Sequence, residues 1–423
     1  MKPSFPSAVY VSALMNGYRV QPGLLLQYLN KIQIQFSYVP AKAIERLASN
    51  LDITESRIRG VIEFYSFLHT TPRGQYDILF SDSITDHMLG SRTLLQNLCT
   101  QLDVELGTPR SDGLVTIGTT SCTGFCDQGP ALLVNGQVIT LLDNRRIKKI
   151  AGLVEAGTSI SKWPAEFFQV NDNIRRHDLL LNDNKSNGSA IQTLLENGAE
   201  TTLKELDHSG LRGRGGAGFK TAMKWQFCRE AQRNQHYVVC NADEGEPGTF
   251  KDRILLDSYA DEVIEGMTLC AGIIAAQQGY IYLRGEYFYL LEPLEAILKK
   301  RRQSGLLGKD ILGKTGFDFD IEIHLGAGAY ICGEESALIE SLEGKRGIPR
   351  KRPPFPVTHG FRNQPTVVNN VETFFAAAKI AANGSNWFRS AGTEQSTGTK
   401  LLSISGDCAQ PGIYEYPFGV SIR

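Results

Sequence analysis

The sequence predicts a multidomain α/β protein, and three observations lead to that prediction. First, the chain has 423 residues, which is enough for two or three domains. Second, apolar positions at helical spacing give way near residue 70 to short runs typical of strands. Third, strands and helices alternate over the larger C-terminal part, as in layered α/β domains. These observations predict a helical segment over 1–70, a small α/β domain over 71–165, a large α/β domain over 166–395 and the start of a β module over 396–423.

The first two parts differ in their periodicity. Apolar residues recur at helical spacing in LLLQYLNKIQ (24–33) and ITESRIRGVIEFYSFL (53–68). Beyond them YDILF (76–80) predicts a strand and GSRTLLQNLCTQLDV (90–104) a helix. GLVTIGTTSC and ALLVNGQVITLL then predict strands, with Asn135-Gly136 as a hairpin turn. Strand, helix and terminal hairpin form the outline of a thioredoxin-like domain.

The large domain follows a polar stretch around 155–190, in which NDNKSNGS (182–189) indicates a linker or surface loop. The last stretch, GTKLLSISGDCAQPGIYEYPFGVSIR, predicts a β-hairpin that opens another module. Within the large domain the predicted strands are HYVVCNA, YIYLRGEY and FDIEIHLGAG, and the predicted helices are TAMKWQFCREAQ, ADEVIEGMTLCAGIIAAQQ and EPLEAILKKRRQ.

Composition and charge exclude several classes of protein. A formal net charge of −1 with 21% charged residues gives no bias toward nucleic acid. No apolar run approaches membrane-spanning length, and the N-terminus lacks the pattern of a signal peptide. Eight scattered cysteines are too few for a disulfide scaffold, so we expect a reducing cytoplasm.

The stretch GLRGRGGAGFKTAMKW (210–225) is rich in glycine and leads into a predicted helix. Gly213, Gly215 and Gly218 have the spacing of a dinucleotide-binding turn, but the preceding LKELDHSGLR does not predict a strand. A P-loop is also disfavoured, because Phe219 stands where its lysine is needed. Glycines before a helix still suit a phosphate group, although a lone cluster also fits a mobile surface loop.

Three further segments of the large domain carry polar residues suited to a ligand. They are VVCNADEGEPGTFKDR (238–253), GAGAYICGEESALIESLEGKRGIPRKRPPFP (326–356) and PTVVNNVET (365–373). Carboxylates accept hydrogen bonds from hydroxyl groups, whereas the N–H groups of a glycine loop donate to phosphate. Together the segments suggest a ligand with both phosphates and hydroxyls, although any one acidic turn could simply be solvated.

These four segments together resemble the flavin- and NADH-binding subunit of respiratory complex I. The resemblance is strongest to the diaphorase flavin subunits of cytoplasmic NAD-reducing [NiFe] hydrogenases, which carry a fused thioredoxin-like domain. Residues 1–165, with FYSFL and TSCTGFCDQGPA, resemble that fused domain, so the resemblance covers nearly the whole chain.

The resemblance implies two cofactors, FMN and NAD(H), between which a hydride is transferred without a catalytic side chain. It implies that the glycine loop and Lys224 hold the FMN phosphate and ribityl chain. It also implies that three phenylalanines stack on NADH. The implied FMN-binding residues are Gly213, Arg214, Gly215, Gly216, Lys224, Asn241, Asp243, Glu244, Tyr330, Gly333, Glu334, Asn369, Asn370 and Thr373. The implied NAD-binding residues are Phe219, Phe227, Glu246, Glu335, Arg352 and Phe355.

The chain departs from the family at three places. Arg352 stands where the family often has lysine, and the basic run around it could also be a solvated turn. The resemblance implies a [2Fe–2S] site of four cysteines, of which Cys122 and Cys126 are present while Ser81 and Asp86 replace the first pair. Because oxygen ligands substitute poorly for thiolates, we expect no cluster there. The family's [4Fe–4S] motif is expected only in a C-terminal part beyond Arg423, inside a ubiquitin-like module, which favours a fragment.

The resemblance implies partners as well as an activity. They are an iron–sulfur electron-transfer subunit and the [NiFe] hydrogenase subunits, with neither nucleic acid nor direct membrane contact. The flavin subunits of complex I and of NAD-dependent formate dehydrogenase are alternatives, because the electron partner belongs to other chains. A P-loop-like NTPase and a non-catalytic assembly subunit are alternatives from other classes, and bound flavin would argue against both.

Overall fold

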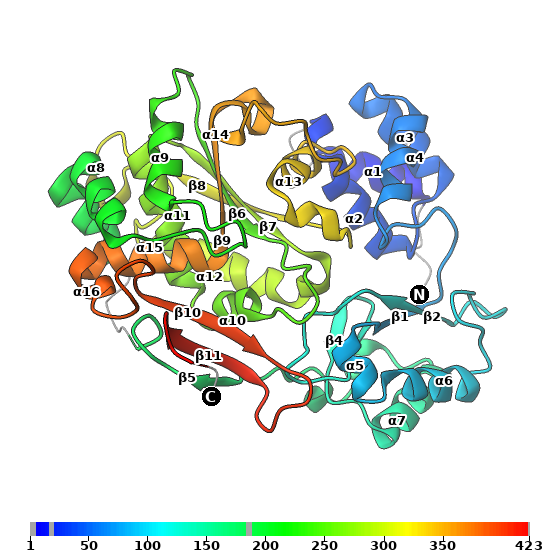
Figure 1. The fold of residues 1–423 in the computed structure, drawn as a ribbon. Helices are drawn as coiled ribbons and strands as arrows, with labels where there is room; N and C mark the ends of the chain where they lie inside the picture. The colour runs from blue at the N-terminus through cyan, green and yellow to red at the C-terminus, as the bar shows by residue number, and fades with distance from the viewer. Residues whose placement is uncertain (1–5, 17–20, 183–187, 422–423) are drawn as a thin grey trace.

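The computed structural model describes residues 6–16, 21–182 and 188–421. Helices from the N-terminus, a small α/β unit and a large α/β unit lie side by side, and the C-terminal strands lie against the large unit (Figure 1). Within the described ranges, no helix has the length and apolar character needed to cross a membrane. The predicted linker residues 183–187 lie outside these ranges.

The N-terminal segment is helical, as predicted, and covers one face of the large sheet. Helix α3 is amphipathic and buries residues such as Leu47, and α4 is capped by Thr54, whose side chain accepts a hydrogen bond from Arg57 N. These helices share a hydrophobic core with Val239 and Tyr280 of the large sheet. The helices are α1 (Ser7–Asn16), η1 (Pro22–Leu24), α2 (Leu25–Phe36), α3 (Ala41–Leu51) and α4 (Glu55–Phe64).

The small unit has a sheet of order β2-β1-β3-β4, which confirms the thioredoxin-like prediction. Strands β1 and β2 are parallel, with Tyr76 opposite Val115, and β3 is antiparallel to β1. Asn135 and Gly136 have φ values of 48° and 81°, as the predicted hairpin turn requires. The elements are β1 (Tyr76–Ser81), α5 (Ile84–Met88), α6 (Ser91–Gln101), β2 (Val115–Thr120), β3 (Leu132–Val134), β4 (Gln137–Ile139), α7 (Asn144–Glu155), η2 (Ile160–Lys162) and η3 (Ala165–Phe167).

The large unit is built on a parallel sheet of order β8-β7-β6-β9. Val238 and Cys240 of β6 pack on the side of the large core, whereas Val239 packs toward the N-terminal helices. Burial on both faces explains the uninterrupted apolar run of this strand. Strands β6 and β9 end together, with Asn241 paired to Asn370.

The elements of the large unit alternate between strands and helices, as the sequence predicts. Its strands are β6 (Tyr237–Ala242), β7 (Gln278–Leu283), β8 (Asp320–Leu325) and β9 (Thr366–Asn370). Its α-helices are α8 (Ser189–Ser209), α9 (Thr221–Glu230), α10 (Lys251–Ser258), α11 (Ala260–Ile274), α12 (Leu291–Gln303), α13 (Glu335–Leu342), α14 (Pro356–His359), α15 (Val371–Asn383) and α16 (Ser385–Arg389). Its 3₁₀ helices are η4 (Gly285–Leu290), η5 (Ile311–Gly313), η6 (Tyr330–Gly333) and η7 (Phe361–Asn363).

The C-terminal hairpin contains a third strand that the sequence analysis interpreted as part of a linker. Strands β10 (Thr399–Ile404) and β11 (Gly412–Pro417) are antiparallel, and β5 (Ile174–Arg176) pairs parallel to β11. The interpretation was wrong for 174–176 because a three-residue strand with two arginines has no apolar pattern. Buried Glu415 fixes this segment by accepting hydrogen bonds from the N–H groups of Asp178, Leu180 and Leu181.

Candidate cofactor site

The glycine loop is closed at its neck and open at its tip. Gly213 N donates to Phe219 O at 2.9 Å, and Thr221 N donates to Leu211 O at 3.0 Å. Helix α9 begins at Thr221, directly after this neck. Gly216 has a φ of 114°, which a side chain would strain, so this position requires glycine. The loop therefore presents its main chain just before a helix N-terminus, as the sequence predicts.

The loop lies against the end of β9. A Cβ atom on Gly215 would come within 3.3 Å of Asn370 Cβ, and Arg214 N donates to Thr373 Oγ1 at 2.9 Å. The Arg214 guanidinium leaves the loop, donates to Thr399 O at 2.9 Å and lies 4.9 Å from the centre of the Phe418 ring. The side chain of Arg214 thus anchors the loop to β10, and only its main chain lies with the glycines.

The loop after β6 places polar groups beside this edge of the sheet. Asn241 Nδ2 donates to Gly333 O at 2.8 Å, and Asn241 Oδ1 accepts from Asp243 N at 3.1 Å. Among the described residues the buried Oδ2 of Asp243 has no hydrogen-bond partner. Loss of hydration raises the pKa of Asp243 to about 8, and Glu286 adds to the shift while Arg284 opposes it.

The Glu244 carboxylate is already used within the protein. Its oxygens accept from Asp252 N at 3.1 Å and Arg253 N at 3.2 Å, which are N–H groups of the first turn of α10. Tyr287 OH donates to the same carboxylate at 2.9 Å. Burial, followed by the charge of Asp252, raises the pKa of Glu244. Glu244 therefore shapes the loop, and its carboxylate is not directed at open solvent.

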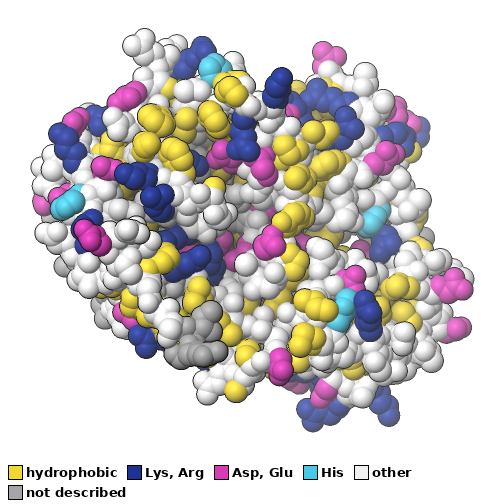
Figure 2. All heavy atoms as spheres, viewed as in Figure 1, with side chains coloured by type: hydrophobic (Ala, Val, Ile, Leu, Met, Phe, Trp, Pro, Cys, Tyr) yellow, Lys and Arg dark blue, Asp and Glu magenta, His cyan; other side chains and the backbone are white. Residues whose placement is uncertain are grey.

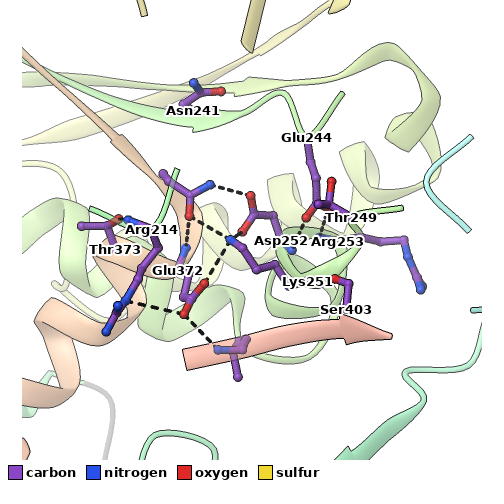
Figure 3. A network of polar contacts seen from close by, with 12 residues as sticks. Arg214, Asn241, Glu244, Thr249, Lys251, Asp252, Arg253, Glu372, Thr373 and Ser403 are labelled. Carbon is purple, nitrogen blue, oxygen red and sulfur yellow. Dashed lines mark hydrogen bonds and ion pairs between the residues drawn. The ribbon is translucent and has the colours of Figure 1, made fainter. Parts of the chain in front are cut away.

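A buried network of charged residues lies beneath the loop (Figure 3). Lys251 Nζ lies 2.6 Å from Asp252 Oδ1, 3.1 Å from Glu372 Oε2 and 3.1 Å from Asn370 Oδ1. Asn370 Nδ2 donates to Asp252 at 2.6 Å, and Leu401 N of β10 donates to Glu372 at 3.2 Å. The sequence analysis missed Lys251, Asp252 and Glu372 as site residues, although they lie in the TFKDR and NNVET motifs. The network joins β9, α10, α15 and β10 around the candidate site.

Large aromatic side chains near the loop are exposed. Phe219, Phe227 and Phe355 are 44%, 44% and 53% exposed, and Tyr330 is 60% exposed. The rings of Phe219 and Phe227 have centroids 6.5 Å apart, and Tyr330 OH donates to Glu246 at 2.5 Å. Figure 2 shows hydrophobic side chains gathered on the face over α9, α14 and α13. These aromatics leave flat apolar faces open, which suits the stacking of a base.

Charged residues from three segments meet beside the aromatics. Lys224 Nζ lies 3.1 Å from Glu335 Oε2 and donates to Val368 O at 3.0 Å. Arg352 lies 3.3 Å from Glu335 and 3.4 Å from Glu334. Glu334 also caps α13 through the N–H groups of Ser336 and Ala337. Asn369 Oδ1 accepts from Trp225 Nε1 at 2.9 Å and holds α9 against β9.

The residues present fit FMN. A loop whose glycines could not be replaced without strain, an unpartnered carboxyl oxygen on Asp243 and the asparagines at the ends of β6 and β9 provide donors and acceptors for a phosphorylated, hydroxyl-rich molecule. A separate cavity of about 1040 Å³ lies between α2, α12 and β8. Its described lining contains none of the predicted site residues, so it is not the site built here.

The residues of the thioredoxin-like unit do not fit a four-ligand [2Fe–2S] cluster. Both oxygens of buried Asp86 are engaged, because Oδ2 accepts from Ser81 and Ser83 at 2.6 and 2.7 Å and Oδ1 accepts from Ala131 N at 3.0 Å. Burial raises the pKa of Asp86, which weakens it further as an anionic ligand. Within the described chain, no three His, Cys, Asp or Glu side chains are grouped as a metal site requires.

Two sequence families account for most of the chain. Residues 11–155 match the thioredoxin-like [2Fe-2S] ferredoxin family, and residues 206–379 match the Nuo51 FMN-binding domain. The fold and the site therefore define a protein in which a flavin-binding α/β domain follows a thioredoxin-like domain.

Comparison with known proteins is more specific. The chain is 41% identical over 425 residues to the alpha subunit of the NAD-reducing hydrogenase HoxS of Cupriavidus necator, covering 98% of this chain and 71% of that protein. The chain belongs to the family of this hydrogenase subunit. A solved NAD⁺-reducing [NiFe]-hydrogenase in the H₂-reduced state matches with a TM-score of 0.90 and 42% identity over 96% of this chain and 68% of that chain.

A second group of relatives shares the large domain. The F 2 subunit of the NADH-quinone oxidoreductase of Rhizobium meliloti is 51% identical over 218 residues, which are 52% of each chain. The F-type NADH-quinone oxidoreductase protein of Escherichia coli is 47% identical over 222 residues, covering 52% of this chain and 50% of that protein. The chain thus spans about half the length of these relatives.

Proposed function

We propose that this chain is the diaphorase part of a cytoplasmic NAD-reducing [NiFe] hydrogenase. It binds FMN and NAD(H), between which a hydride passes, and the bound flavin exchanges single electrons with iron–sulfur centres. The observation that supports this most is the meeting of the glycine loop, the loop after β6 and Asn370 beside exposed phenylalanines. In the full complex this activity couples oxidation of hydrogen to reduction of NAD⁺.

The FMN phosphate and ribityl chain are assigned to the main chain of Gly213–Gly218, the start of α9 and Lys224. N–H groups near a helix N-terminus favour an anion, and Lys224 adds a cation only partly exposed to solvent, at 19%. Asn241 and Asn370 stand at paired positions of adjacent strands, where their amides and the Asp243 carboxyl offer hydrogen bonds to the flavin. Tyr330, Gly333, Glu334, Asn369 and Thr373 complete the assigned set.

NADH is assigned to the exposed face next to the flavin. Phe219, Phe227 and Phe355 stack on its rings, and Glu246 and Glu335 accept hydrogen bonds from its hydroxyls or amide. Arg352 supplies a planar guanidinium to the pyrophosphate, with Glu334 and Glu335 holding it in place at 3.4 and 3.3 Å. These side chains align the nicotinamide and exclude water, and none acts as a general acid or base.

The thioredoxin-like unit is assigned a bracing role without a cluster. Arg253 NH2 lies 2.7 Å from Asp127 Oδ1, and both side chains are fully buried. Arg284 links Cys122 O, at 2.7 Å, to Glu244 O in the flavin domain. These contacts fix the unit to the loop after β6 and support a surface for the iron–sulfur subunit of the diaphorase and the hydrogenase subunits.

Anaerobic titration of the purified protein with NADH tests the proposal. We expect a yellow protein that contains FMN and loses its visible flavin absorbance when NADH is added. A protein that lacks flavin after reconstitution with FMN would contradict the FMN assignment. A yellow protein that NADH does not bleach would contradict the NADH assignment.

A flavin subunit of an NADH-quinone oxidoreductase is the second candidate. The 51% identity to the Rhizobium meliloti protein over half of the chain favours it, whereas the match over 98% of the chain favours the hydrogenase. Purification of the native complex separates the two. We expect hydrogen-dependent reduction of NAD⁺, and quinone-dependent oxidation of NADH without hydrogenase activity would support the second candidate.

A further inference from the structure

Cys122 and Cys126 lie together on the loop that follows β2. Their sulfur atoms are 3.6 Å apart, and the side chains belong to residues only 1% and 2% exposed. Gly124 N donates to Cys122 Sγ at 3.4 Å, which holds the intervening residues in a tight turn around the sulfur. The two thiols are therefore held in contact by the fold.

The groups around the pair leave these thiols without a metal-binding partner. The Asp86 carboxylate is engaged by Ser81, Ser83 and Ala131 N. Two adjacent thiols that do not bind a metal have a well-defined chemistry, the interconversion of dithiol and disulfide. A disulfide needs a sulfur separation of about 2.05 Å, so each sulfur has to move by less than about 1 Å.

We propose that Cys122 and Cys126 form a redox modification site, a dithiol that a small peroxide oxidises reversibly to an intrachain disulfide. Because both sulfurs are buried, the oxidant has to be small and uncharged, and hydrogen peroxide meets this requirement. The proposal depends on neither FMN nor NADH binding to the chain.

The oxidation takes place in two steps. The Cys122 thiolate attacks one peroxide oxygen, an S–O bond forms, the O–O bond breaks, and hydroxide leaves and takes up a proton as water. Cys126 sulfur then attacks Cys122 sulfur, so that an S–S bond forms, the S–O bond breaks and a second water leaves with the thiol proton. The two thiols lose two electrons and the peroxide gains them. A dithiol reductant returns the pair to thiols by exchange.

The pair lies in the seam between the two units. Arg284 NH2 donates to Cys122 O at 2.7 Å, and the same guanidinium donates to Glu244 O of the loop after β6. Gly124 packs so tightly on Tyr287 that a Cβ atom would lie 2.4 Å from its hydroxyl oxygen. A disulfide would thus form where the thioredoxin-like unit contacts the candidate cofactor site.

Peptide mass spectrometry of the full chain tests the proposal. Cleavage after Arg110 and Arg145 yields one peptide, 111–145, that contains both cysteines and none of the other six. The reduced protein is exposed to hydrogen peroxide, denatured, alkylated and digested. We expect this peptide to lose about 2 Da and to escape alkylation, and to regain both thiols after dithiothreitol. The peptides with the half-buried Cys99 and Cys408 act as internal controls and should stay alkylated.

Two results would overturn the proposal. One is a peptide 111–145 that stays doubly alkylated while Cys99 or Cys408 is oxidised. The other is a purified chain that carries two irons and acid-labile sulfide, both lost in Cys122→Ser. In Cys126→Ser we expect dimedone to trap a sulfenic acid on Cys122, because no resolving thiol remains. The measurement on the unaltered chain stands by itself if that variant does not fold.

Discussion

Lys224 Nζ lies 3.1 Å from Glu335 Oε2, so the cation assigned to the flavin is paired with a carboxylate assigned to NADH. The two side chains are 19% and 23% exposed and come from α9 and α13, which are distant in sequence. A second bond, from Lys224 to Val368 O at 3.0 Å, directs the ammonium group toward the end of β9. The pair therefore links the two assigned sites, and a change at Lys224 should affect both.

Lys224→Ala is expected to weaken FMN binding. A hydrogen bond to a charged group contributes about 1.5–3 kcal/mol, which corresponds to about a 10- to 150-fold loss of affinity. The measurement is flavin content after purification and titration of the apoprotein with FMN. Lys220→Ala is the matched control, because Lys220 is exposed at the cap of the same helix. Normal flavin affinity in Lys224→Ala would indicate that this lysine serves only the ion pair.

Phe219→Ala is expected to weaken NADH binding while FMN stays bound. Stacking of an aromatic side chain on a base contributes about 1–3 kcal/mol, so KM for NADH should rise by about tenfold or more. The change should appear in KM and leave kcat nearly constant, because base contacts are similar in the ground and transition states. Leu312→Ala removes a side chain of similar exposure, 42% against 44%, on another loop. Flavin loss with an unchanged KM would place Phe219 at the other cofactor.

Asp127→Ala is expected to destabilise the protein strongly. Removing one partner of a buried ion pair leaves the other charge without compensation and costs about 3–5 kcal/mol. Here Arg253 and Asp127 are both fully buried where the two units meet. Urea unfolding measures the loss, and Lys149→Ala is the control because its pair with Glu166 is exposed and should contribute less than about 1 kcal/mol. Equal effects of the two variants would contradict a bracing role for this contact.

The flavin-free protein is expected to lose stability as pH rises. Burial raises the pKa of Asp243 from its usual 3.8 to about 8, so the folded state holds this proton more tightly than the unfolded state does. Between about pH 4 and pH 8 the free energy of unfolding should fall by up to about 1.4 kcal/mol per pH unit. Asp243→Asn should reduce this slope, whereas Asp407→Asn, at an exposed position, should leave it unchanged. Unfolding at several pH values that gives the same slope for Asp243→Asn and the unaltered protein would exclude this titration.

The sequence predicts elements well where the local pattern is strong, and the fold class was confirmed. The run Val238-Val239-Cys240 predicts a buried strand, and Asn135-Gly136 predicts its hairpin turn. Strand β5 (Ile174–Arg176) has no such pattern, because its partner is β11, far along the chain. The direction of a side chain is equally hidden. Arg214 belongs to the glycine loop by sequence, yet its guanidinium reaches Thr399 O.

The site was visible in the sequence as motifs but not as a network. The glycines and asparagines mark it because their chemistry is unusual at those positions. Lys251, Asp252 and Glu372 resemble ordinary surface charges in the sequence, whereas the structure buries all three side chains to within 11% exposure. Burial depends on the meeting of distant segments, which local patterns do not reveal. The assignment of individual residues to FMN and NADH remains a prediction.

The last prediction concerns iron in the thioredoxin-like unit. We expect the full chain, expressed with iron and sulfur supplied, to contain no [2Fe–2S] cluster. Cys122 and Cys126 provide two thiolates, and Asp86 and Ser81 are bonded to each other at 2.6 Å. Oxygen ligands suit the irons of such clusters poorly, and both oxygens of Asp86 would first have to lose their present hydrogen bonds.

Restoring the missing thiolates gives the converse experiment. Ser81 Oγ lies 3.4 Å from Thr123 N, directly beside Cys122, so residues 81 and 122 face the same small volume. In the double variant Ser81→Cys/Asp86→Cys we expect iron, acid-labile sulfide and an EPR signal after reduction with dithionite, because four thiolates then surround that volume. Ser81→Ala/Asp86→Ala removes the same hydrogen bonds without adding thiolates and should remain free of iron. Two irons per chain in the unaltered protein, lost in Cys122→Ala, would show that oxygen ligation suffices and would make Asp86 or Ser81 a cluster ligand.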